Sequence, residues 1–135
     1  MKGDIMKENR FTGRDRVSSF RNALNGLKIV IRGEHNAWIQ LAVAFCVIIA
    51  AVIFKITTAE WIAIVFATGL VISLEIINTS IEKLADIVSQ EKQEAIKKVK
   101  DISAGGVLIG AITALVIGLI IFLPRFLELL TIRSQ

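Results

Sequence analysis

The chain has 135 residues, of which 54% are hydrophobic and 21% charged, with a mean hydropathy of +0.66 and a formal net charge of +4. This composition is too apolar for an ordinary soluble fold, and the length fits one domain, so we expect an all-α membrane protein. Cys and His each occur once, as Cys46 and His35, so one chain cannot form an internal disulfide or a thiolate metal site, and His35 by itself builds neither a histidine metal site nor a Ser-His-Asp triad. No nucleic-acid partner is expected.

The N-terminal region is predicted to be a polar tail, residues 1–15, followed by a surface helix, residues 16–33. Apolar side chains recur there at three- and four-residue intervals, while basic side chains occupy the other faces: Val17, Phe20, Ala23, Leu24, Leu27 and Ile31 against Arg16, Arg21, Lys28 and Arg32. This pattern is typical of an amphipathic helix in the membrane interface. Pattern alone leaves open whether the helix is a generic anchor or part of a catalytic site.

Three segments are predicted to cross the membrane: residues 36–54, 59–88 and 102–124. The first contains 19 consecutive residues without a charge and the third contains 22, and each run is long enough for a hydrocarbon core of about 30 Å. The middle segment has 14 uncharged residues before Glu75 and reaches spanning length through the isoleucines that follow. Residues 89–101 are expected to form a connector with a mostly polar helical piece at residues 90–100, and Pro124 is expected to end the third span.

Basic residues predict how these segments are oriented. Residues 1–34 carry eight Lys or Arg, the 55–60 loop carries Lys55, and five more lie in the 83–101 region: Lys83, Lys92, Lys97, Lys98 and Lys100. The positive-inside rule therefore places the N-terminus and the 83–101 region in the cytoplasm, and the 55–60 loop and the C-terminus outside.

Acidic and amide side chains interrupt the second span. Glu75, Asn78, Glu82 and Asp86 are spaced i, i+3, i+7 and i+11 and therefore share one helix face. A carboxylate at the centre of a membrane helix costs roughly 2.5–3.5 kcal/mol, so it is normally retained for a function. At 1.5 Å of rise per residue, Glu75 and Glu82 are about 10 Å apart along the axis. That separation suits one group acting on a reactant while the other holds a metal or a phosphate.

Further polar groups lie at the cytoplasmic ends of all three predicted spans. Glu34 precedes the first, Glu82 and Asp86 lie in the second, and Lys100-Asp101 precedes the third. Carboxylates without His or Cys suit a hard cation such as Mg²⁺. Lys100 can neutralise phosphate charge, and the deeper Glu75 can act as a general base toward a lipid hydroxyl. The alternative is three interfacial polar patches and one Glu in an interhelical hydrogen bond. The sequence lacks the GxxxxGK[ST] and GxGxxG signatures of soluble kinases.

These residues resemble a known family, the small bacterial membrane lipid kinases that comprise diacylglycerol kinase and its Gram-positive relative, undecaprenol kinase. The hallmark run E-x-x-N-[TS]-[AS]-I-E-x-x-x-D stands here at Glu75 to Asp86. Lys100-Asp101 followed by small residues is a second match, and Phe20, Ala23, Gly26-Leu27 and Glu34-x-Asn36 form a third. The resemblance covers roughly residues 16–124 with order and spacing intact.

The resemblance implies a role for each matching residue. Glu75 matches the general base, Glu34 and Glu82 match the carboxylates that hold the metal on ATP, and Lys100 and Asp101 match residues at the nucleotide. Glu91 falls near the nucleotide-contacting stretch, and Asn78, Asp86 and Asn36 are the supporting polar groups. One departure is Asp15, which occupies a position where several relatives carry a basic residue, so that Arg14 or Arg16 takes that role or the position is lost.

The resemblance also implies a reaction and an assembly. We expect an ATP- and Mg²⁺-dependent homotrimer with shared sites, at the cytoplasmic face of the bacterial plasma membrane, and the Gly106-x-x-x-Gly110 pattern is consistent with close helix packing. Details such as Glu34-x-Asn36 and the ending Ile120 to Pro124 favour undecaprenol as substrate over diacylglycerol. A remote alternative is a non-enzymatic scaffold or ion-conducting oligomer, with rings of Glu75 selecting cations.

Overall fold

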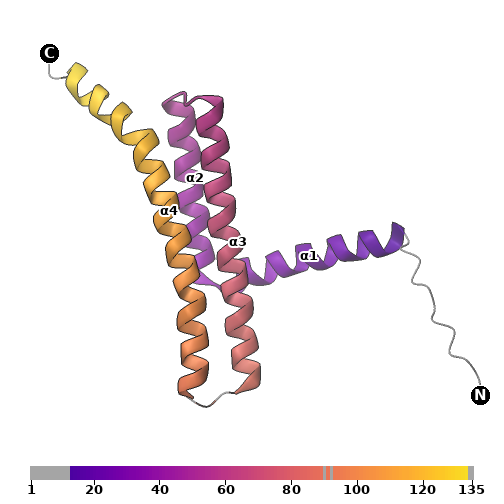
Figure 1. Cartoon of the computed structure of the whole chain (residues 1–135). Coiled ribbons are helices and arrows are strands. Elements are labelled where there is room, and N and C mark those ends of the chain that lie inside the picture. Colours follow the sequence, from indigo (N-terminus) through magenta and orange to yellow (C-terminus); the bar gives the residue numbers. More distant parts are fainter. Residues whose placement is uncertain (1–12, 90, 92, 134–135) are drawn as a thin grey trace, which may run out of the picture.

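Within residues 13–89, 91 and 93–133, which the computed structural model describes, every regular element is an α-helix, as predicted. The four helices are α1 (Gly13–Gly33), α2 (His35–Ile53), α3 (Thr58–Val88) and α4 (Glu94–Arg133). Figure 1 shows that α2 and α4 both run alongside α3, while α1 projects sideways from the start of α2. The bundle therefore has two ends, one with the α2–α3 turn and the other with the α3–α4 loop.

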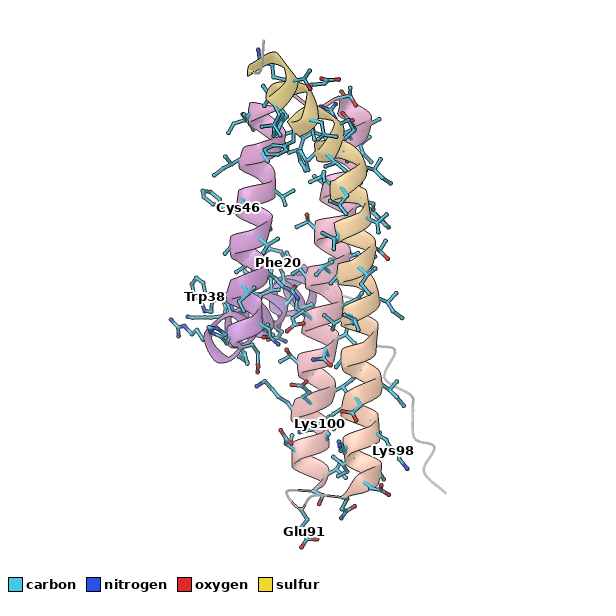
Figure 2. The ribbon with its side chains drawn as sticks, turned by 90° about the vertical axis from the view of Figure 1, so that its left-hand side faces the viewer. Phe20, Trp38, Cys46, Glu91, Lys98 and Lys100 are labelled. Carbon is cyan, nitrogen blue, oxygen red and sulfur yellow. The ribbon has the colours of Figure 1, made fainter. Side chains whose placement is uncertain are left out.

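Three helices of the described chain are long and apolar enough to span a membrane: α2, α3 and residues 94–131 of α4. Most of their large apolar side chains are exposed on this single chain. Figure 2 shows Trp38, for example, pointing away from the other helices. Such surfaces require lipid or neighbouring protein, because water would leave a large apolar area hydrated. The sequence prediction of a three-span membrane protein is confirmed.

The helix bounds differ from the prediction at two places in α4. The helical piece predicted within the connector is continuous with the third span, because α4 begins at Glu94 and runs without a break into the span. Glu, Lys and Ala favour helix, and Lys98 pairs with Glu94 one turn away at 4.0 Å. Hydropathy locates the apolar part of a helix, but the backbone hydrogen bonds of the helix can continue into a charged segment outside the span.

The helix does not stop at Pro124, where the third span is predicted to end, because α4 continues to Arg133 with Pro124 inside it. A proline in a helix interior removes one backbone hydrogen bond and crowds the carbonyl four residues earlier, which bends the helix. In Figure 1 the last part of α4 leans away from α2 and α3. The Arg125 guanidinium donates to the carbonyl of Ile121 at 2.5 Å, which supplies a donor at the bend.

α1 begins at Gly13 rather than residue 16, and residues 1–12 of the predicted tail lie outside the described residues. Glu34 stands between α1 and α2 in an extended conformation. In Figure 1 this corner meets α3 well before the α3–α4 loop, so both α3 and α4 extend beyond the level of α1. The surface helix, the first span and the polar part of the second span therefore meet at one place.

The end with the α2–α3 turn is closed by apolar packing. Ala51, Ile56, Ile64 and Ile121 are buried together, and the rings of Phe54 and Phe122 lie 6.0 Å apart beside them. Further along, Gly110 of α4 faces Leu74 so closely that a Cβ at Gly110 would lie 2.6 Å from a methyl carbon of Leu74. The second glycine of the GxxxG pattern thus lets α4 approach α3, whereas a Cβ at Gly106 would meet no neighbouring atom within 4 Å among the described residues.

Candidate active site

Glu75 is a buried carboxylate in the middle of α3, with 5% of its surface exposed. Its Oε2 accepts a hydrogen bond from Nε2 of Gln40 in α2, at 3.3 Å. A carboxylate withdrawn from water normally has several partners, because burying a charge without compensation is costly. Among the described residues, Gln40 is the side chain that hydrogen-bonds to Glu75.

A cavity of about 160 Å³ lies against Glu75. It is enclosed by the surface helix, the first span and the second span, and its lining is Leu27, Val30, Ile31, Ala37, Gln40, Leu41, Ile72, Glu75 and Ile76. A cavity needs only about 10–15 Å³ of this kind of volume to hold one water molecule, so this one has room for a small group beside the carboxylate. The cavity thus presents a carboxylate to a small group within apolar walls.

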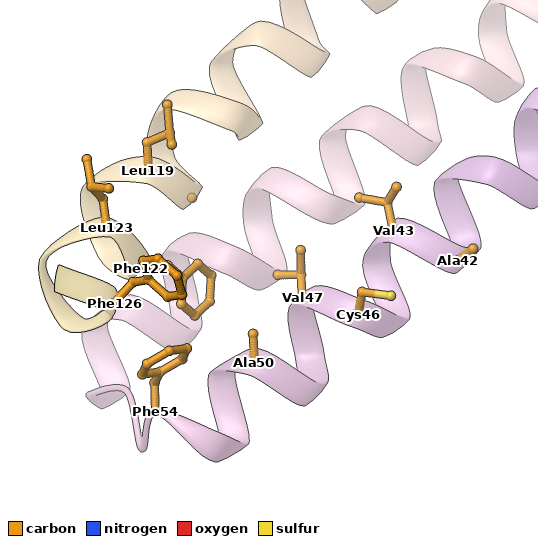
Figure 3. A pocket seen from close by; sticks show the side chains of 11 residues that line it. Ala42, Val43, Cys46, Val47, Ala50, Phe54, Leu119, Phe122, Leu123 and Phe126 are labelled. Atoms are coloured by element: carbon orange, nitrogen blue, oxygen red, sulfur yellow. The ribbon is translucent and has the colours of Figure 1, made fainter. Parts of the chain in front are cut away.

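A second, larger cavity of about 570 Å³ lies between α2 and α4 toward the α2–α3 turn (Figure 3). Its lining is apolar except for the Cys46 thiol, and includes Val43, Val47, Phe54 and Phe122. A site for phosphoryl transfer needs charged and proton-accepting groups, and this lining carries none. The candidate active site is therefore the Glu75 cavity.

Asn78 and Glu82 form the next layer of α3 toward the α3–α4 loop. Asn78 has 6% of its surface exposed, and its Nδ2 donates to Oε1 of Glu82 at 2.9 Å. Oδ1 of Asn78 is buried and has no hydrogen-bond partner among the described residues. An orphaned buried acceptor costs about 1–3 kcal/mol. It is therefore available to a donor or a cation that arrives with a ligand.

Glu34 lies at the same level as this layer. Its Oε1 accepts from Nζ of Lys83 at 2.9 Å, and Lys83 directly follows Glu82 in α3. The structure thus brings the two predicted metal ligands to one level of the bundle, Glu34 from the α1–α2 corner and Glu82 from α3. No group of three or more acidic, His or Cys side chains clusters in the described residues. Two carboxylates nevertheless fit Mg²⁺, which is commonly bound by one or two carboxylates together with substrate phosphates.

The remaining predicted residues lie farther from Glu75. Lys100 of α4 forms an ion pair with Asp86 of α3 beyond the level of α1, and Asp101 is exposed beside it. Figure 2 shows Glu91 at the tip of the α3–α4 loop, and Asn36 is exposed on the first turn of α2. One chain therefore brings Lys100 and Asp86 together but does not gather Glu91, Asp101 and Asn36 around Glu75.

The basic position predicted near Asp15 lies at the far end of α1. Arg16 is separated from Gly33 by about 26 Å of helix, at 1.5 Å per residue, and its side chain is exposed. The side chain of Arg14 lies outside the described residues. Arg16 therefore does not reach the Glu34 layer of its own chain.

Sequence reasoning missed two residues of the site, Gln40 and Lys83. The sequence could have indicated Gln40, because burying a primary amide inside a predicted span costs free energy unless the amide has a hydrogen-bond partner. Lys83 was counted as a charge that sets orientation, and its pairing with Glu34 depends on a contact across 49 positions of sequence.

Known proteins are similar in sequence to this chain over most of its length. The chain matches the prokaryotic diacylglycerol kinase family over residues 21–122. It is 35% identical to the undecaprenol kinase of Bacillus subtilis over 107 residues, which cover 79% of this chain and 87% of the relative. It is 33% identical to the diacylglycerol kinase of Synechocystis over 113 residues, or 83% of this chain and 65% of the relative. A Helicobacter pylori diacylglycerol kinase matches over 81 residues at 33% identity, with 58% and 62% covered.

Proposed function

Because this chain belongs to the prokaryotic diacylglycerol kinase family and is a membrane lipid kinase, we propose that its substrate is a long-chain polyprenol, undecaprenol. It would transfer the γ-phosphate of ATP to the hydroxyl and produce undecaprenyl phosphate, so that the carrier used in cell-wall synthesis is recycled. The observation that carries this proposal is the apolar-walled cavity that lies against the Glu75 carboxylate.

Glu75 supplies the base in the proposed reaction. The hydroxyl oxygen attacks the γ-phosphorus, the hydroxyl proton passes to the Glu75 carboxylate, and the bond to the bridging oxygen breaks so that ADP leaves. A positioned general base contributes about 100- to 10,000-fold to a rate. Because Glu75 is buried against the cavity, the alcohol can react without leaving the bilayer.

The layer of Glu34 and Glu82 is proposed to hold the nucleotide phosphates through the metal. Bound Mg²⁺ would neutralise phosphate charge as the γ-phosphoryl group is transferred. Glu34, now paired with Lys83, and Glu82, which accepts from Asn78 at 2.9 Å, are the residues that would hold the metal. Lys100 and Asp101 are proposed to contact the nucleotide, and Lys100 leaves Asp86 to do so.

The polar groups of the cavity favour a polyprenol over diacylglycerol. Diacylglycerol carries two ester groups close to its hydroxyl, and their carbonyls lose hydrogen bonds to water on entering an apolar site. The side-chain donor in the cavity lining, Nε2 of Gln40, already gives one of its two N–H groups to Glu75, so at most one remains for the two carbonyls. A polyprenol has no second polar group to satisfy. Diacylglycerol remains the second candidate, since two of the relatives described above are named for it.

We propose a homotrimer with shared sites in the plasma membrane, with the Glu34 layer at the cytoplasmic face. The broad exposed apolar surfaces of α2 and α4 support an assembly. So does the position of Arg16, which lies too far along α1 to serve the site of its own chain. The basic residues on the α1 side and in the α3–α4 region support the cytoplasmic orientation.

The proposal is tested by offering both alcohols to the purified protein. Labelled ATP and Mg²⁺ are supplied with undecaprenol or diacylglycerol in matched detergent micelles, and kcat/KM is measured for each. We expect undecaprenol to be preferred by at least about tenfold, which corresponds to about 1.4 kcal/mol of discrimination in the transition state. Phosphorylation of diacylglycerol with undecaprenol left untouched would contradict the polyprenol assignment. Failure to phosphorylate either alcohol would contradict the role of the cavity as an alcohol site.

A further inference from the structure

We infer that Gln40 is a positioning residue that holds the Glu75 carboxylate in its reactive orientation, an inference that rests on the proposed function. Gln40 lies on α2 and Glu75 on α3, and their hydrogen bond joins the first two spans within the cavity wall. The bond uses Oε2 of Glu75 and leaves Oε1 as the acceptor for the hydroxyl proton.

Glu75 needs such a partner because its side chain can otherwise rotate. The surrounding cavity walls come from Leu27, Val30, Ile72 and other apolar residues, which restrict the carboxylate by shape but not by direction. A hydrogen bond to a carboxylate is directional and stronger than one between neutral groups. A misplacement of about 1 Å at a reacting group can lower a rate by about 100-fold. The amide of Gln40 therefore acts on the rate through the geometry of Glu75.

The amide oxygen of Gln40 supports a functional rather than a structural role for this residue. Its Oε1 is buried and has no hydrogen-bond partner among the described residues. A half-satisfied amide in an apolar wall is less stable than a Leu or Met of similar size. The hydrogen-bond donor that a polyprenol brings is its hydroxyl, so the alcohol can pair with this oxygen on arrival and then turn to Glu75 as its proton is transferred.

The test compares Gln40→Met with the neighbouring control Ile39→Met. Met preserves the length of Gln but removes both amide groups, whereas Ile39 is half exposed and is absent from the cavity lining. We expect Gln40→Met to lower kcat by about 10- to 100-fold while the KM for ATP stays unchanged. Ile39→Met should keep the wild-type kcat. Thermal unfolding and the elution profile of the assembly show whether each variant folds.

A double-mutant cycle asks whether Gln40 acts through Glu75. Glu75→Asp keeps the carboxylate but shortens the side chain, so its contact with Gln40 is lost. In that background Gln40→Met should lower kcat by less than about twofold. Unchanged kcat in Gln40→Met alone, or an equal loss in both backgrounds, would overturn the inference.

An infrared readout separates this inference from the proposed function. The carboxylate stretching band of Glu75 is identified by its disappearance in Glu75→Gln, and it should shift in Gln40→Met in the absence of either substrate. A band that stays in place means that the contact does not orient Glu75, whichever alcohol the protein phosphorylates. A shifted band together with no transfer to undecaprenol would overturn the polyprenol assignment and leave the contact itself standing.

Discussion

The start and the middle of α3 each carry a carboxylate, and the two differ in how many hydrogen bonds they accept. Near the α2–α3 turn, Glu60 accepts from the backbone amide and the hydroxyl of Thr57, at 2.7 and 2.9 Å, and from Arg125 at 2.8 Å. The hydroxyl of Thr57 in turn accepts from the amide of Glu60, which completes a capping box. In the middle of the same helix, Glu75 has the hydrogen bond from Gln40 at 3.3 Å.

The difference in hydrogen bonding indicates that Glu60 contributes to stability, and it agrees with the proposed reactive role of Glu75. The bonds of Glu60 fix the start of α3 and join it to α4 across 65 positions of sequence, so that its charge is fully compensated. The groups around Glu75 include two buried oxygens without partners, on Gln40 and Asn78, within the described chain. Unsatisfied polar groups weaken a fold and are retained where a ligand completes them. The hydrogen bonds at the turn end thus stabilise the fold, whereas the Glu75 region is where we propose that a ligand binds.

The largest expected effect is on kcat, when the charge of Glu75 is removed and the same change at Glu60 serves as the control. Glu75→Gln should lower kcat for lipid phosphorylation by about 100- to 10,000-fold, because the amide cannot accept the hydroxyl proton. Glu60→Gln should keep kcat near the wild-type value when activity is expressed per assembled protein. The measurement is transfer of labelled phosphate from ATP after gel filtration of both variants. Equal losses in the two variants would erase the distinction between the regions.

The sequence predicted the parts of the fold that depend on residues close together in the chain. Charge-free runs locate three spans because each polar group costs free energy in a hydrocarbon core, and α2 differs from its prediction by one residue at each end. The end of α4 was mispredicted, because the effect of Pro124 depends on its surroundings. There Arg125 bonds both the carbonyl of Ile121 and the carboxylate of Glu60. That bracing spans two helices and is invisible to hydropathy.

The site was predictable along one helix but not between helices. Helical spacing places Glu75 and Asn78 on one face, and both are buried in the structure. Asp86 shares that face yet is exposed, because α3 extends there beyond the α1–α2 corner. The partners Gln40 and Lys83 join residues 35 and 49 positions apart. Only the packing of α1, α2 and α3 brings such groups together.

A smaller effect is expected from Arg125→Met at the turn end. The substitution keeps most of the apolar stem but removes the donor to Glu60 and to the carbonyl of Ile121. We expect a lower midpoint of thermal unfolding in detergent with kcat retained, because both bonds lie away from the Glu75 cavity. Arg133→Met changes an Arg at the end of the same helix, beyond the bend, and serves as the control. If Arg125→Met loses activity without losing stability, the turn end also contributes to the reaction.

The smallest effect should come from Lys83→Met, which tests whether Glu34 exchanges partners. Lys83 and Glu34 form a partly exposed ion pair, and pairs of this kind are worth about 0–1 kcal/mol. Removing the ammonium group frees Glu34 for the metal, so the Mg²⁺ concentration for half-maximal nucleotide binding should fall by up to about fivefold. Binding is measured by titrating Mg²⁺ against a fluorescent ATP analogue, without lipid. Lys98→Met removes a comparable exposed charge near the α3–α4 loop and should leave the titration unchanged. A rise in the Mg²⁺ requirement in Lys83→Met would instead mean that Lys83 helps to bind the phosphates. The Lys83 ammonium group, and not just the carboxylates of Glu34 and Glu82, would then contribute to nucleotide binding.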